Sequence, residues 1–224
     1  MLGLIYDVHG NLPALEAVLD DASDVDSWLL GGDYALFGAW PADTVERLRQ
    51  LDAHWIRGNG ERWTAEPADA PEQARAAISW CAGMLGRDVV AELHELPQTH
   101  TVGETLYCHG SPGSDVDSFL PEPGDDEAEL LEGIDSTRVV FGHTHLPFAR
   151  TSEGGVELIN PGSVGMPFDG DPRAAYAVIG DDGAVEHRRV AYDHQASAAA
   201  IRERLGPAGE VPAARVERAS AEVG

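Results

Sequence analysis

The stretch LGLIYDVHGN, residues 2–11, passes from a short apolar run into polar residues. The apolar run predicts a buried strand. Asp7 and His9 stand where this strand ends, and because they are two residues apart they face the same side of an extended chain. The stretch therefore predicts a strand whose end presents two candidate metal ligands at one point.

Helical and strand-like segments alternate through the first 60 residues. Apolar residues at helical spacing predict helices over 12–22 and 42–51, and short apolar runs predict strands over 25–32 and 53–58. This alternation of strand and helix favours a sheet with helical crossovers.

The rest of the chain predicts more helix and then a strand-rich second half. Residues 70–96 have a helical pattern with a break near Gly86, and residues 194–205 predict a last helix. We expect one domain over residues 1–205. The segment 206–224 is rich in Ala, Glu and Pro, and we expect it to be loosely ordered and outside the core.

The 224-residue chain carries 39 acidic and 15 basic residues, a formal net charge of −24, and every base is arginine. This charge repels polyanions and anionic surfaces, so we expect no binding to long nucleic acid or to a membrane. No apolar run reaches the roughly 20 residues that span a bilayer. The start, MLGLIYDV, lacks the features of a secretory signal, so we expect a cytoplasmic location.

Polar side chains follow the predicted strands at their carboxyl ends, where sheets with crossovers bind ligands. The candidates are Asp7, His9, Asp33, Asn59, His109, His143 and His145. Imidazole, carboxylate and amide donors suit Mn, Fe, Co, Ni or Zn, and no CxxC motif offers thiolates. Seven donors exceed the number that one ion usually takes from protein, so we expect two divalent ions bridged by a carboxylate.

Each of these residues also has an ordinary structural interpretation. Asp7 or Asp33 alone is typical of a cap or turn, and His109 alone of a hydrogen-bonded structural histidine. Asn59-Gly60 alone is the strongest short signal for a hairpin turn. Their occurrence in order at five strand ends favours a shared site, so we interpret Asn59 as a ligand after a parallel strand.

The ordered motifs DVHGN (7–11), GGD (31–33), GNGE (58–61), HG (109–110) and GHTH (142–145) carry a family resemblance. With NPGSVG (160–165), they resemble the calcineurin-like metallophosphoesterases, in particular the small bacterial and archaeal phosphodiesterase-type branch. The resemblance covers residues 1 to about 192. It implies an α/β (α+β) fold, a four-layer αββα sandwich of two mixed β-sheets flanked by helices.

The resemblance also implies roles for individual residues. Asp7, His9, Asp33 and His145 would hold the first ion, with manganese preferred, and Asp33 would bridge to the second. Asn59, His109 and His143 would complete the second site. Asn11 would lie near the substrate phosphate or orient a bridging water, and hydrolysis would use a water or hydroxide activated by the two ions.

One position departs from the family pattern. Many relatives carry a histidine straight after the asparagine of the GN motif, and this chain has Gly60, which offers only backbone. The proton donor is therefore open, with Glu61, Arg62 or a metal-bound water as candidates. We also expect Arg62 or Arg57 to contact the scissile phosphate, although an ion pair with one of the many acids explains either residue equally well.

The expected function is an enzyme, a phosphodiesterase that hydrolyses small or nucleotide-like phosphate esters. A phosphomonoesterase, or a protein or dinucleoside-polyphosphate phosphatase of the superfamily, is an alternative, but those relatives usually add an Asp-Arg-Gly motif where this chain has GGDYALFGAW. A non-catalytic scaffold, like the retromer subunit that lacks key ligands, is a second alternative. A small phosphoester is the expected partner, and a homo-oligomer is left open.

Overall fold

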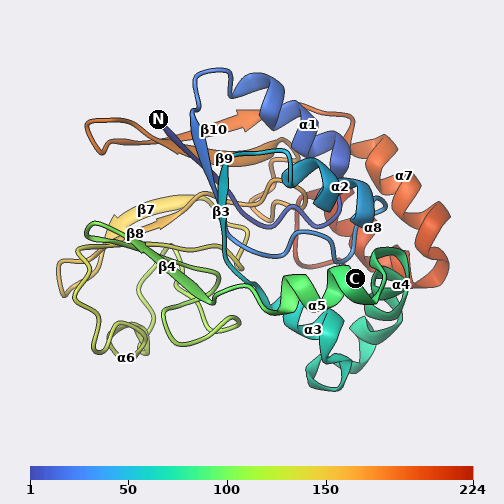
Figure 1. The fold of residues 1–224 in the computed structure, drawn as a ribbon, viewed down its shortest axis with the longest axis horizontal. Helices are drawn as coiled ribbons and strands as arrows, with labels where there is room; N and C mark the ends of the chain where they lie inside the picture. The colour runs from blue at the N-terminus through green and yellow to red at the C-terminus, as the bar shows by residue number, and fades with distance from the viewer. Residues whose placement is uncertain (224) are drawn as a thin grey trace.

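Two mixed five-stranded sheets form the centre of the computed structural model, which describes residues 1–223 (Figure 1). The first sheet has the order β10-β9-β1-β2-β3, with β1, β2 and β3 parallel and β9 antiparallel to both of its neighbours. Its strands are β1 (Leu2–Ile5), β2 (Ser27–Leu30), β3 (Ala53–Trp55), β9 (Ala174–Ile179) and β10 (Val185–Val190).

The second sheet has the order β4-β5-β6-β8-β7. Its three central strands run parallel, and each edge strand is antiparallel to its neighbour. The strands are β4 (Thr99–Val102), β5 (Thr105–Cys108), β6 (Arg138–Val140), β7 (Phe148–Thr151) and β8 (Glu157–Asn160). In both sheets the parallel strands direct their carboxyl ends to one edge, which is the geometry that the crossover pattern predicted.

Helices flank the two sheets, so the fold class implied by the family resemblance is confirmed (Figure 1). The helices are α1 (Leu12–Asp21), α2 (Pro41–Leu48), α3 (Asn59–Ala65), α4 (Arg75–Leu85), α5 (Arg87–His94), α6 (Glu127–Leu130), α7 (His194–Leu205) and α8 (Glu210–Arg218). Short 3-10 turns lie at Pro67–Asp69, Glu72–Ala74 and Gly206–Gly209. None of the helices within residues 1–223 has the length and apolarity that a membrane span requires.

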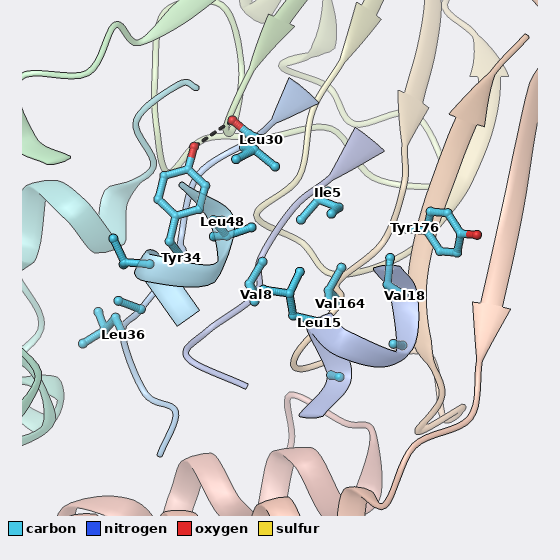
Figure 2. Close-up of a cluster of buried hydrophobic side chains, with 14 of the residues drawn as sticks. Ile5, Val8, Leu15, Val18, Leu30, Tyr34, Leu36, Leu48, Val164 and Tyr176 are labelled. Carbon is cyan, nitrogen blue, oxygen red and sulfur yellow. Dashed lines mark hydrogen bonds between the residues drawn. The ribbon is translucent and has the colours of Figure 1, made fainter. Parts of the chain in front are cut away.

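The alternation of side chains along β1 divides the core into layers. Leu4 and Tyr6 lie between the two sheets with Val140 of the second sheet, and the Tyr6 hydroxyl donates to the Val140 carbonyl at 3.2 Å. Ile5 instead faces the helical layer, where it packs with Leu15 of α1 (Figure 2). Each such fully buried side chain stabilises the fold by about 1.5–3 kcal/mol.

The outer face of the second sheet has a thinner cover. Phe141 packs there against Phe119, with ring centroids 4.9 Å apart. Leu130, at the end of the short helix α6, packs against the same cluster. This fourth layer is therefore a long connection with one helical turn, and α1, α2, α4 and α5 cover the first sheet more fully.

The structure resolves the two local interpretations of Asn59-Gly60. Strand β3 is parallel to β2, and Asn59 begins helix α3. A hairpin at Asn59-Gly60 is therefore absent, as the convergence of strand ends indicated. The predicted break of the 70–96 helix is also present at Gly86, whose φ of 77° ends α4.

The expectation of a loosely ordered tail is wrong for most of residues 206–223, while Gly224 lies outside the described residues. Helix α8 packs against α7, and its Ala213 and Val216 are buried in one cluster with Ile201 of α7. The buried face is made of Ala, Val and Pro, and it is covered by α7 and by Ala39, Ala77 and Met166, which are distant in sequence. The boundary of the domain at residue 205 remains a prediction.

Candidate metal centre

All seven predicted ligands meet at the shared edge of the two sheets. Asp7, Asp33 and Asn59 follow β1, β2 and β3 of the first sheet. His109 follows β5, and His143 and His145 follow β6 of the second sheet. Their side chains are buried except that of His143, which is partly exposed. The order of motifs in the sequence therefore becomes one cluster in space.

Asp33 lies between two halves of this cluster. Its Oδ2 is 3.8 Å from His9 Nε2, and its Oδ1 is 3.5 Å from His109 Nε2. On the first side, His9 Nε2 and His145 Nε2 are 3.1 Å apart. On the second side, Asn59 Oδ1 is 3.0 Å from His109 Nε2 and 2.9 Å from His143 Nδ1.

Asp7 also lies close to both halves. It belongs to two groups of three residues whose ligand atoms all lie within 4.8 Å of one another. The first group is Asp7, His9 and His145, and the second is Asp7, Asp33 and His109. Asp7 Oδ1 is buried and has no hydrogen-bond partner within residues 1–223, with His145 Nε2 at 3.4 Å. A buried carboxylate oxygen without a donor is costly, and a cation at this position would satisfy it.

The backbone contacts of the histidines fix which ring nitrogen faces the cluster. His9 Nδ1 lies 2.9 Å from the Leu36 carbonyl oxygen, and His145 Nδ1 lies 2.6 Å from that of Met166. His109 Nδ1 lies 2.8 Å from the Gly31 carbonyl oxygen. Because a carbonyl oxygen only accepts, each Nδ1 carries a proton, and each Nε2 faces the cluster, where it offers a lone pair whenever the ring is neutral.

The Nε2 atoms of His9 and His145 face one another directly, and that of His109 faces the Asn59 carbonyl oxygen. Burial lowers the pKa of His109, but the carboxylates of Asp33 and Asp7 outweigh this and raise it. When both rings are neutral, the lone pairs of His9 and His145 repel unless a cation lies beside them. Burial lowers the pKa of His9 to about 3 and that of His143 to about 4, so both rings are neutral near pH 7. The donor set of N and O atoms therefore fits divalent metal ions.

The backbone of the cluster adopts an uncommon conformation. Asp7, His9, Asp33, His143 and His145 all have φ between 49° and 66°, the left-handed region that L residues seldom occupy. Each such residue costs on the order of 1–3 kcal/mol, and such residues cluster at functional sites. Both residues of each i, i+2 pair, Asp7 with His9 and His143 with His145, therefore leave the extended conformation that the sequence analysis assumed for them.

Glu61 is a structural part of the site that the sequence analysis named only as a candidate proton donor. It is 3% exposed, and its Oε2 accepts hydrogen bonds from the backbone amides of Asp33 at 2.9 Å and Gly58 at 2.8 Å. Its Oε1 accepts from the amide of Tyr34 at 2.9 Å. With both oxygens occupied by amides, Glu61 positions the Asp33 loop.

The NPGSVG segment, residues 160–165, holds the loop after β1. The Ser163 hydroxyl donates to the Asp7 carbonyl at 2.7 Å, and the Gly165 amide donates to the same carbonyl at 3.0 Å. A Cβ at Gly165 would lie 1.9 Å from the Val8 carbonyl oxygen, so only glycine permits this approach. The motif thus fixes the backbone of Asp7 through its carbonyl group.

The structure places Asn11 and Arg62 outside the seven-residue cluster. The Asn11 amide nitrogen donates to the Gly165 carbonyl at 2.8 Å, and its oxygen accepts from the Ser197 hydroxyl at 3.0 Å. Arg62 forms a bidentate pair with Asp115, with both distances 2.6 Å. Asn11 therefore ties the loop after β1 to α7, and Arg62 could reach a phosphate only by leaving Asp115.

Arg57 also contacts protein and not the cluster. Its guanidinium donates to the His94 carbonyl at 2.9 Å. Gly60 contacts the cluster directly, because its amide donates to Asp33 Oδ1 at 2.6 Å. The site therefore offers no side-chain proton donor at position 60, and the roles predicted for Asn11, Arg57 and Arg62 remain predictions.

A cavity of about 410 Å³ opens in front of the cluster. His9, Asp33, Asn59, His143 and His145 form its polar end. Most of its remaining lining is apolar and includes Phe37, Trp63 and Phe168. Its volume lies in the range of small-molecule sites, which are about 300–1,000 Å³.

A family model, the calcineurin-like phosphoesterase superfamily domain, matches residues 1–182. The chain belongs to this superfamily. It is therefore a hydrolase of phosphoric esters from a metal-dependent family, and the resemblance seen in the sequence is confirmed.

Individual relatives cover most of the chain. A phosphodiesterase of Escherichia coli is 31% identical over 202 residues, which is 81% of this chain and 89% of the relative. An uncharacterised protein of Methanocaldococcus jannaschii is 30% identical over 219 residues, 86% of this chain and 88% of its own length. The crystal structure of a metallophosphoesterase from Sphaerobacter thermophilus matches with a TM-score of 0.85 at 30% identity, covering 97% and 98% of the two chains.

Proposed function

We propose that the protein is a phosphodiesterase that hydrolyses small or nucleotide-like phosphate esters at a dinuclear metal centre. The observation that carries the proposal is the position of three Nε2 atoms. Those of His9 and His109 lie 3.8 and 3.5 Å from the two oxygens of Asp33, and that of His145 lies 3.1 Å from His9 Nε2. The name of the E. coli relative, a phosphodiesterase, supports the preference for diesters.

Asp33 is proposed as the bridging ligand of two ions. Asp7, His9 and His145 would hold the first ion, and Asn59, His109 and His143 the second. When bound, two divalent ions lower the pKa of a water between them and neutralise charge on the phosphoryl group. Manganese is the ion that we expect from the family resemblance, and the imidazole, carboxylate and amide donors would also suit Fe, Co, Ni or Zn.

The chain itself supplies orientation. The carbonyls of Leu36, Met166 and Gly31 hold the Nδ1 protons, so the three rings keep their Nε2 atoms towards the ions without reorganising. Glu61 fixes the backbone from which Asp33 projects. These contacts are formed before substrate arrives, which is the preorganisation that favours catalysis.

Gly60 bears on the choice of substrate. A histidine at this position would protonate a departing oxygen, and Gly60 donates only its amide, which already binds Asp33. Esters whose leaving oxygen needs no proton, such as phenolates, should therefore be the best substrates. Arg62 remains a proposed phosphate contact that requires release from Asp115.

The test compares bis-p-nitrophenyl phosphate with p-nitrophenyl phosphate on the full chain with added manganese. We expect turnover of the diester and about two bound ions per chain. In His143→Ala we expect turnover to be lost and the metal content to fall. Turnover of the monoester alone would replace the proposal with a phosphomonoesterase. Absence of both bound metal and turnover would indicate the non-catalytic scaffold.

A further inference from the structure

The C-terminal segment forms a wall of the cavity over the metal cluster. Pro207, Ala208, Val211, Pro212 and Arg215 line it. Helix α8 is held in place by the buried cluster that joins Ala213 and Val216 to Ile201 of α7 and to Met166. This wall comes from the part of the chain beyond the region that the family model matches.

Arg215 is the one arginine among the described residues that line this cavity. In a chain with 39 acidic residues, no carboxylate of the described residues lies within 4.0 Å of it. Its Nε donates to the Ala221 carbonyl at 3.3 Å. The side chain is partly buried, and this burial lowers the pKa of Arg215. Within the described residues, Arg215 thus lacks the anionic partner that Arg62 and Arg202 have.

An aromatic stack connects Arg215 to the metal cluster. The Arg215 guanidinium carbon lies 5.6 Å from the Phe168 ring centroid. Phe168 stacks on His145, with centroids 4.3 Å apart and an interplanar angle of 21°. The guanidinium is therefore one ring removed from a predicted metal ligand and faces the same cavity.

Apolar side chains line the cavity around this stack. Phe37 and Trp63 come from the loop after β2 and from α3, and Val211 of α8 is 50% exposed. Flat apolar groups pack well against such aromatic walls, and a few polar groups fix their orientation.

We propose that Arg215 binds an anionic phosphoryl oxygen of the substrate and that Phe37, Trp63, Phe168 and Val211 receive an aromatic substituent of the phosphodiester. This inference rests on the proposed function, because the same cluster would bind the scissile phosphate. It makes the C-terminal helix a specificity-determining part of the site. The substrate class is an organic phosphodiester with one flat apolar substituent, such as an aryl or nucleobase-bearing group.

Two p-nitrophenyl diesters test the apolar wall, because their leaving group is the same. Bis-p-nitrophenyl phosphate has a second aromatic ring, and methyl p-nitrophenyl phosphate has a methyl group in its place. We expect a KM at least about 10-fold lower for the aromatic diester. Val211→Ser should raise that KM about 3-fold and leave the KM of the methyl diester unchanged. Equal KM values for both substrates in the wild-type protein would overturn the assignment of the apolar wall.

Arg215→Gln tests the cation, with Arg218→Gln on the exposed end of the same helix as the matched control. We expect the KM for both diesters to rise about 10- to 100-fold in Arg215→Gln with kcat changed far less, and partial rescue by Arg215→Lys. Arg218→Gln should keep wild-type constants. Wild-type KM values in a folded Arg215→Gln would refute the role, because a purely structural arginine would not separate KM from kcat.

Calorimetry with inorganic phosphate keeps this test independent of turnover. The manganese-loaded wild-type protein should bind phosphate, and Arg215→Gln should weaken that binding about 10- to 100-fold. If no diester is hydrolysed but this difference remains, the proposed function fails and the phosphate role of Arg215 stands. If diesters are hydrolysed and phosphate binds both proteins equally, the proposed role of Arg215 is refuted and the proposed function stands.

Discussion

The carboxylate of Glu61 holds the backbone of Asp33, whose amide donates to Glu61 Oε2 at 2.9 Å. The two residues belong to different crossover units, since Asp33 follows β2 and Glu61 lies in the first turn of α3. The same Oε2 also accepts from the Gly58 amide next to Asn59. One buried carboxylate therefore sets the positions of two predicted ligands relative to each other.

Glu61→Gln should weaken the metal site and the fold together. The amide keeps one acceptor oxygen and turns an NH2 group towards backbone N–H donors, which leaves at least one of them without a partner. We expect a loss of about 1–3 kcal/mol in the free energy of unfolding, measured with urea. The affinity for manganese should fall about 10-fold, measured by calorimetry. Glu66→Gln, at the exposed end of α3, is the control, and equal values in both variants would contradict the positioning role.

Asp33→Asn should remove the bridge between the two proposed ions. The variant keeps the size of the side chain but loses the charge between His9 and His109. We expect turnover to fall about 100-fold or more and the bound metal to drop below two ions per chain, with an unchanged circular dichroism spectrum. Asp43→Asn, on the exposed surface of α2, should behave as wild type. Retained turnover with two ions bound would refute the bridging role.

Removal of metal should destabilise the whole protein. Without a cation, the Nε2 lone pairs of His9 and His145 face each other at 3.1 Å, and Asp7 Oδ1 stays buried without a partner. Manganese at 100 times its Kd should therefore raise the free energy of unfolding by about 2.7 kcal/mol over the chelator-treated protein. Thermal denaturation measures this gain as a higher Tm. The gain should shrink in His143→Ala and persist in His54→Ala, whose ring lies on the exposed surface.

Gly60→Ala should disturb Asp33 by contact alone. A Cβ at this position would lie 2.8 Å from Asp33 Oδ1, which already accepts the Gly60 amide at 2.6 Å. We expect weaker manganese binding and turnover reduced about 10-fold or more. Gly83→Ala is the matched control, since Gly83 lies in α4 with open space around it and should gain about 0.5–1 kcal/mol of stability. Wild-type turnover in Gly60→Ala would show that Asp33 moves freely.

The cluster of the seven predicted ligands could be located from the sequence because each of them lies just after one of five strands. The positions of Asp7, Asp33 and Asn59 follow from where a short apolar run ends and from the rule that parallel strands end at one edge. The αββα arrangement came from the family resemblance, and the βαβαβ pattern alone indicated only a sheet with crossovers. Local sequence and the ordered motifs thus determined the polar end of the site.

The remaining walls depend on contacts between residues distant in sequence. Phe168 stacks on His145 and Arg215 lies over Phe168, and neither Phe168 nor Arg215 belongs to any of the motifs that the sequence analysis used. Glu61 could have been recognised as the third residue of a helix that starts after Gly58, where an acid often bonds back to the preceding amide. Helix α8 was missed because Pro212 and the two alanines Ala213 and Ala214 dilute its apolar pattern.

Ala213→Glu should release helix α8 from the fold and open the cavity. Ala213 is fully buried against α7, so a carboxylate there would lose its hydration without a cationic partner to replace it. Hydrogen exchange should show lost protection over residues 206–218 with the sheets still protected, and the KM for bis-p-nitrophenyl phosphate should rise as in Arg215→Gln. Ala199→Glu, which changes an exposed residue of α7 that does not line the cavity, is the control. Full protection of α8 in Ala213→Glu would contradict the packing of this helix, and lost protection with an unchanged KM would show that the wall does not contact substrate.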